Sequence, residues 1–199
     1  HEAGNILIVP SGAFAGLENS ALLKTNLADF VSSGGVLIVF SQQRGYEYSI
    51  LPGSPSGYGF REDQSCYLAG SFLDQFHPIL TSQTDATFDG GIDGFFVEWP
   101  KEAKILLRRV KNNFPAAIVY PYGKGFVVAT TLYTDFAFTS GQLTQDEITF
   151  MKDLISWAKN PKQEYLQTKP GETVSVSVSV TNNTEFNVES ARFEVKDAS

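Results

Sequence analysis

Cysteine, histidine and basic residues are all scarce in this sequence. Its 199 residues include one cysteine, Cys66, and two histidines, His1 and His77. A single cysteine excludes an internal disulfide and a metal site built from several cysteines. Lys and Arg number 15 against 22 Asp and Glu, for a formal net charge of −7. We expect no nucleic-acid partner, because binding to a phosphate backbone requires clustered cations.

Long apolar runs are absent too. None approaches the roughly 18 to 20 residues that cross a bilayer, so we expect no membrane insertion. Two short runs, "NILIVP" (5–10) and "VLIVF" (36–40), are instead typical of strands buried on both faces of a parallel sheet. Between them, apolar residues recur at helical spacing: Leu23, Leu27, Phe30 and Val31. Strand, helix and strand in about 35 residues predict a right-handed βαβ unit.

A long irregular stretch separates this unit from the next regular segments. Residues 41–103 are rich in Gly, Ser, Pro, Asp and aromatics, which indicates functional loops or cover for a sheet edge. Residues 116–133 predict a β-hairpin around a Gly-containing turn. A helix should begin at Thr144, with Glu147 completing a capping box, and end before Pro161. We expect its buried stripe to be Ile148, Met151, Ile155 and Ala158.

The pattern changes after residue 161. "TVSVSVSV" alternates with period 2, so that its valines share one face, and "ARFEVKD" predicts a second strand. Two strands cannot bury a core alone. We interpret 162–199 as a β-strand segment. It is either the start of an immunoglobulin-like sandwich or a pair of strands that pairs with a neighbouring module or chain.

Three stretches carry a family resemblance: "NILIVPSGAFAGLENSALLKTNLADFVSSGGVLIVFSQQ", "HPIL" and "YGKGFVVATTLYTDFAF" before a helix. Together they resemble the class I glutamine amidotransferase-like superfamily, and more closely its non-catalytic branch, such as beta-galactosidase trimerisation domains. The resemblance implies a flavodoxin-like three-layer α/β sandwich with a mostly parallel sheet over residues 1–161. It also implies that an earlier β-α-β portion is lacking.

The catalytic triad of that family is not matched. The family's nucleophilic cysteine follows the strand matched by "VLIVF", in a glycine-flanked turn, where this chain has Ser41, Gln42 and Gln43. Cys66 comes later, in a predicted loop. His77 lies in "FHPI", which is out of order relative to the family motif and lacks its glutamate. We therefore expect no amidotransferase activity, and a packing or turn role for His77.

Other candidate residues have ordinary structural interpretations beside functional ones. Asp89 and Asp93 in "DGGIDG" are weak metal candidates, because calcium loops usually alternate Asp or Asn and this one does not. His1 has only His77 as a histidine partner for copper. No cofactor is indicated. Aromatic residues gather in the irregular stretch, where they either seal the sheet or contact carbohydrate: Tyr46, Tyr48, Tyr58, Phe60, Tyr67, Phe95, Phe96 and Trp99.

Two classes of function remain. We prefer a non-catalytic structural or interaction module of a larger extracellular or cell-surface protein. Its partners would be other domains, other copies of the chain or carbohydrate. The alternative is a hydrolase with a site at the carboxyl ends of the strands, where open α/β sheets bind ligands. Its candidate residues are Ser11, Ser41, Gln43 and Asp135.

Overall fold

The computed structural model describes residues 5–63, 71–73 and 77–161. The predictions for His1, for Cys66 and for the strands of 162–199 lie outside these residues. Along the described chain, the elements are β1 (Ile6–Val9), α1 (Ala21–Ser32), β2 (Val36–Val39), η1 (Gly45–Ile50), β3 (Ser56–Tyr58), β4 (Ser71–Leu73), η3 (Pro78–Leu80), β5 (Thr87–Phe88), β6 (Phe95–Glu98), β7 (Lys104–Arg109), β8 (Pro115–Tyr122), β9 (Gly125–Thr130), α2 (Thr134–Ser140) and α3 (Gln145–Ala158).

One sheet organises the described part of the chain, with seven strands in the order β1-β2-β9-β8-β7-β4-β5. β1 pairs parallel with β2, and β2 parallel with β9. The remaining pairings are antiparallel, so parallel pairing is confined to one side of a mixed sheet. The predicted α/β, flavodoxin-like class is confirmed. So are the βαβ unit, which is β1-α1-β2, and the hairpin, which is β8-β9.

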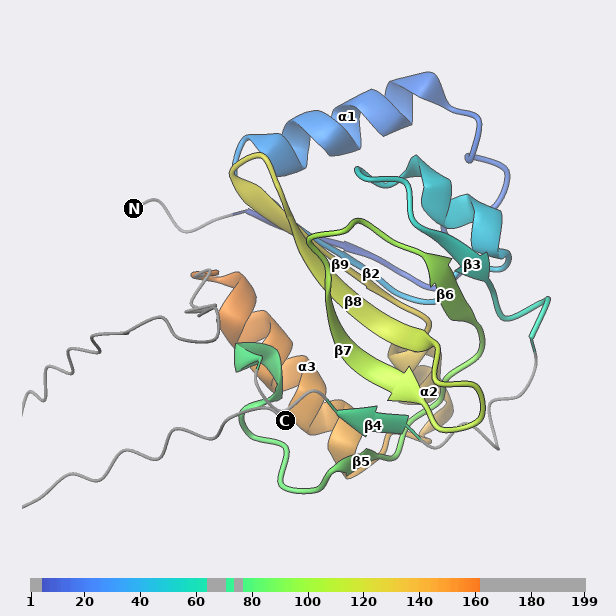
Figure 1. Ribbon diagram of the computed structural model, residues 1–199, viewed down its shortest axis with the longest axis vertical. Coiled ribbons are helices and arrows are strands. Elements are labelled where there is room, and N and C mark those ends of the chain that lie inside the picture. Colours follow the sequence, from blue (N-terminus) through green and yellow to red (C-terminus); the bar gives the residue numbers. More distant parts are fainter. Residues whose placement is uncertain (1–4, 64–70, 74–76, 162–199) are drawn as a thin grey trace, which may run out of the picture. The chain divides into compact units, whose positions relative to one another are not determined.

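Separate apolar clusters bury the two faces of the sheet. Figure 1 shows α1 and α3 on opposite sides of it. Side chains alternate along a strand, so Leu37 and Val39 of β2 face the α1 side while Val36 and Ile38 face the α3 side. All four are fully buried. This double burial explains why the strand sequences are continuously apolar. Helix, sheet and helix form the three predicted layers.

The starts of α1 and α3 follow the capping chemistry of the sequence. Ser20 caps α1, and Thr144 with Glu147 forms the predicted capping box of α3. The α1 face is as predicted, with Leu27 and Val31 buried and the neighbouring apolar residues partly buried against them. Of the predicted stripe of α3, Ala158 is buried, and Met151 and Ile155 are partly buried against the core. The other buried positions are Glu147, Phe150, Leu154 and Trp157, so the buried face is rotated by about one residue from the prediction.

That rotation has a physical cause. Phe150 and Trp157 are the largest apolar side chains of α3, and both pack in the core beneath the sheet. The Glu147 carboxylate is also buried, and its Oε1 accepts hydrogen bonds from Gly91 N (3.3 Å) and Thr134 Oγ1 (3.3 Å). Periodicity could not anticipate a buried carboxylate with distant donors.

The irregular stretch supplies cover on two sides of the sheet. β4 and β5 extend its edge beyond β7, and η1 with the two-stranded β3-β6 sheet closes the α1 face. Of the predicted aromatic cluster, Tyr48 and Phe96 are core residues with rings 4.9 Å apart. No helix in the described ranges is long and apolar enough to cross a membrane.

Candidate functional site

The carboxyl ends of β1, β2 and β9 meet at one edge of the sheet. Gly12 N donates to Ser41 O (2.8 Å), and Ser41 N donates to Leu132 O (2.8 Å), so hydrogen bonds join the three strand exits. The segments that leave β1 and β2 pass to the α1 face, whereas the segment that leaves β9 passes to the α3 face. This divergence is a topological switch point, the position where open α/β sheets form ligand crevices.

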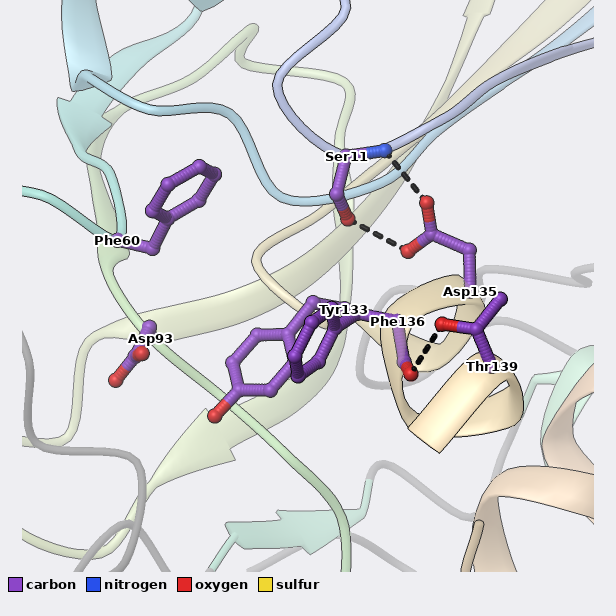
Figure 2. Close-up of a pocket in the computed structure, with 7 residues that line it drawn as sticks. All are labelled: Ser11, Phe60, Asp93, Tyr133, Asp135, Phe136 and Thr139. Carbon is purple, nitrogen blue, oxygen red and sulfur yellow. Dashed lines mark hydrogen bonds between the residues drawn. The ribbon is translucent and has the colours of Figure 1, made fainter. Parts of the chain in front are cut away.

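A pocket with a volume of about 630 Å³ lies at this edge (Figure 2). That volume is within the range of small-molecule sites. The lining combines three aromatic rings with two carboxylates and two aliphatic hydroxyls, from Phe60, Tyr133, Phe136, Asp93, Asp135, Ser11 and Thr139. The predicted site residues Ser11 and Asp135 therefore lie in one pocket, together with the weak metal candidate Asp93.

Both carboxylate oxygens of Asp135 accept hydrogen bonds from Ser11. Ser11 N donates to Oδ2 at 2.8 Å, and Ser11 Oγ donates to Oδ1 at 2.7 Å, across 124 residues of sequence (Figure 2). Asp135 is in the first turn of α2, so the two bonds fasten the start of this helix to the loop after β1. Both donors are neutral, and they therefore orient the carboxylate without cancelling its charge.

Ser41, the other hydroxyl candidate, donates to a backbone carbonyl rather than to a basic side chain. It is fully buried, and its Oγ donates to the backbone carbonyl of Asp93 at 3.2 Å. Beside it, Tyr48 OH accepts from Gln42 N (3.0 Å) and donates to Thr130 O (2.8 Å). Burial raises the pKa of Tyr48, so this phenol stays a neutral hydrogen-bonding group. The arrangement is that of a packed strand end.

Gln43 is near the pocket but is not among its lining residues. Its side chain is 3.5 Å from the Cβ position at Gly12. No role was predicted for Gln42 from the sequence, but its buried side chain holds the segments after β1 and β2 together. Its Oε1 accepts from Phe14 N (2.9 Å), and its Nε2 donates to Phe40 O (2.9 Å).

Phe60 is brought to the pocket by close backbone contact. Phe60 N donates to Gln42 O at 3.0 Å, which pairs the segment after β3 with the segment after β2. Gly59 makes this approach possible, because a Cβ at this position would fall 2.4 Å from Gln42 O. Glycine is therefore required to place the aromatic ring.

A buried ion pair lies next to this wall. Arg109 of β7 is 1% exposed, pairs with Asp63, and donates from Nη1 to Gly94 O at 3.3 Å. Its guanidinium also lies 5.1 Å from the centre of the Phe95 ring. Gly94 follows Asp93, so the pair supports the backbone that presents Asp93. Sequence reasoning missed Arg109, since nothing in "KILLRRV" distinguishes a buried arginine from an exposed one.

His77 is at a different place from the pocket, and its predicted turn role is what the structure shows. It is 5% exposed and caps η3, with Nδ1 accepting from Ile79 N at 3.1 Å. Its ring meets the Trp157 ring edge-on, with centres 5.6 Å apart. Burial, helped by the charge of Lys104, lowers the pKa of His77 to about 4.

The two aspartates of "DGGIDG" do not form a common site. Asp89 is exposed, and its backbone atoms bond to the side chains of Asp146 and Thr144, whereas Asp93 lines the pocket. Among the residues described, no group of three or more His, Cys, Asp or Glu side chains could hold a metal ion. Sequence reasoning also missed three pocket residues, Tyr133, Phe136 and Thr139. Tyr133 and Phe136 lie in a stretch that carries the family resemblance, but nothing in its pattern showed that their side chains line a pocket.

The fold and the position of the pocket define a flavodoxin-like α/β domain with a crevice at its switch point. Neither family models nor curated protein sequences match this chain. Among solved structures, it is similar to a cytoplasmic protein of Salmonella typhimurium, with 13% identity, a TM-score of 0.53, and coverage of 77% of this chain and 71% of that one.

Two further solved structures are similar. A protein of Bacteroides uniformis described as ThuA-like has 12% identity and a TM-score of 0.51, over 80% of this chain and 71% of that one. The cold-adapted beta-galactosidase of Rahnella sp. R3 has 14% identity and a TM-score of 0.52, over 79% of this chain but only 23% of that one. At such identities the likeness concerns the fold. It agrees with the α/β fold that the amidotransferase-like resemblance of the sequence implied.

Proposed function

We propose that this chain is a non-catalytic interaction module that binds a saccharide in the pocket at the carboxyl ends of β1, β2 and β9. The observation that carries the proposal is the lining of that pocket. Phe60, Tyr133 and Phe136 offer aromatic faces for the apolar faces of sugar rings, while Asp93 and Asp135 offer acceptors for hydroxyl groups. The volume, about 630 Å³, suits a short saccharide.

The geometry of the hydroxyl groups favours binding over hydrolysis. A serine nucleophile needs a positioned base, commonly an imidazole, that is itself oriented by a third group. Ser11 instead donates to a carboxylate, a weaker base than imidazole, and both of its bonds go to the same side chain. Ser41 donates to a carbonyl and is fully buried.

We also propose that the module belongs to a larger extracellular or cell-surface protein. The similar fold in the Rahnella beta-galactosidase occupies less than a quarter of that chain, so this architecture occurs as one portion of a carbohydrate-active protein. The similar Salmonella protein is, by its name, cytoplasmic. Fractionation of cells that produce the protein would decide, and recovery in the cytoplasm would contradict this part of the proposal.

Two phenylalanines of α2 provide a matched test of binding. Phe136 lines the pocket and is 60% exposed, whereas Phe138, two residues on, is 71% exposed and outside the lining. In titrations of the full chain with a panel of oligosaccharides, we expect Phe136→Ala to weaken binding about tenfold, in keeping with the stacking energy of an aromatic ring. Phe138→Ala should leave the affinity unchanged.

Three outcomes would overturn the proposal. If no saccharide of the panel binds, or if both phenylalanine variants bind like the wild type, the pocket is not a saccharide site. If chromogenic esters or glycosides are hydrolysed, and Ser11→Ala abolishes the turnover while preserving the fold, the alternative of a hydrolase at this edge is correct.

A further inference from the structure

The charges of the pocket lining have one sign. Two of the seven lining residues, Asp93 and Asp135, are acidic, and the other five are neutral. In the described part of the chain, Arg109 lies next to this wall, where it donates to Gly94 O, and its guanidinium forms an ion pair with Asp63. The chain as a whole carries a formal charge of −7. The field inside the crevice therefore attracts cations and repels anions.

The carboxylate of Asp135 is oriented so that it can accept hydrogen bonds from a charged group of a ligand. Its two hydrogen bonds come from Ser11, at 2.8 and 2.7 Å, and fix the direction of the carboxylate. An ionised carboxylate has about four acceptor positions, so these two bonds leave capacity for a ligand. Its orientation is set before binding, which lowers the entropic cost of recognition.

The aromatic rings of the lining also favour a cationic ligand. Phe136 and Tyr133 meet edge to face, with ring centres 6.2 Å apart, and Figure 2 shows both rings in the wall beside Asp135. Phe60 is drawn across the pocket from them. Faces of aromatic rings attract ammonium groups, and the attraction grows where water is excluded.

From these features we infer that the pocket selects a ligand that carries a protonated amine. In terms of the function proposed above, on which this inference rests, the ligand is an amino sugar with a free ammonium group. Asp135 accepts hydrogen bonds from the ammonium group, and the aromatic rings cover the carbon skeleton. An N-acetylated or acidic sugar of the same size lacks the charge that this lining favours.

The test uses ligands that differ in charge and little else. Glucosamine, glucose, N-acetylglucosamine and glucuronate are titrated into the full 199-residue chain at about pH 6.5, where carboxylates are ionised and the amine is protonated. Choline serves as a cation without a sugar ring. We expect glucosamine to bind about tenfold more tightly than glucose, which is a usual effect of one charge-assisted hydrogen bond.

A matched pair of variants locates the effect. Asp135→Asn keeps the shape of the side chain and removes its charge, whereas Asp89→Asn removes the same charge from an exposed carboxylate that is not part of the pocket. We expect Asp135→Asn to abolish the preference for glucosamine while binding of glucose persists. Asp89→Asn should retain the preference.

The outcomes separate this inference from the proposed function. Equal binding of glucose and glucosamine, unaffected by Asp135→Asn, would refute the inference and leave the saccharide site standing. Binding of choline without any sugar would support the inference and refute the saccharide proposal. If none of the five ligands binds, both are wrong.

Discussion

Replacing His77 by asparagine should change how the stability of the protein depends on pH. His77 is buried, its pKa is lowered to about 4 by burial and by Lys104, and the ordinary value is 6.5. The unfolded chain therefore takes up a proton as the pH falls below 6.5, while the folded chain resists until about pH 4. Stability from this residue is fully present above the unfolded pKa and is lost as the pH falls through this window.

The size of the effect follows from the shift. At 1.36 kcal/mol per pKa unit, lowering the pH from about 7.5 to about 4.5 should cost the wild type about 2.5 kcal/mol through His77. Asparagine can still cap η3 at Ile79 N but does not titrate in this range. The substitution also removes the ring contact between His77 and Trp157, which lowers the free energy of unfolding by the same amount at every pH.

Urea unfolding of both proteins at the two pH values measures the difference directly. The wild type should lose about 2.5 kcal/mol more than His77→Asn between them, because other titrating groups are common to both and cancel. Profiles that stay parallel to within about 0.5 kcal/mol would refute the reasoning. They would mean that His77 is open to solvent, and its possible participation in chemistry would have to be reconsidered.

Three further predictions concern the walls of the pocket and the helix below the sheet. Arg109→Ala should lower the free energy of unfolding by about 3 to 5 kcal/mol, because it breaks a buried ion pair. Arg108 is less buried, so Arg108→Ala should cost under about 1 kcal/mol. Equal losses of stability for the two variants in chemical denaturation would contradict the buried role of Arg109. Gly59→Ala should displace Phe60, since the Cβ of the new alanine would lie 2.4 Å from Gln42 O. Both saccharide affinity and stability should then fall. A fully stable variant with wild-type affinity would show that Phe60 does not form a wall of the site. Thr144→Ala should cost about 1 kcal/mol by removing the cap of α3, and an unchanged thermal midpoint would show that the capping box contributes nothing.

Local chemistry determined much of the fold. The continuously apolar strand around Leu37, the αβ alternation and the cap at Thr144 are all readable from neighbouring residues, because burial on two faces and capping act over a few positions. The hairpin of β8 and β9 is local for the same reason. These signals predicted the βαβ unit, the hairpin and the capped helix, and the family resemblance then implied a flavodoxin-like α/β fold. Its topology indicated that ligands should bind at the carboxyl ends of the parallel strands.

Long-range packing decided the rest. Ser11 and Asp135 are 124 residues apart, and only the parallel pairing of β1, β2 and β9 makes their contact possible. The buried face of α3 was displaced by a residue, because Glu147 finds its donors in other parts of the chain. Arg109 is buried because Asp63 and Gly94 meet it in space. By itself, the sequence determined β1, α1, β2, the β8-β9 hairpin and α3, and it indicated the strand ends at which a site is expected. Only the tertiary structure decided which side chains line the pocket, because hydrogen bonds and ion pairs between distant segments leave no periodic trace in the sequence.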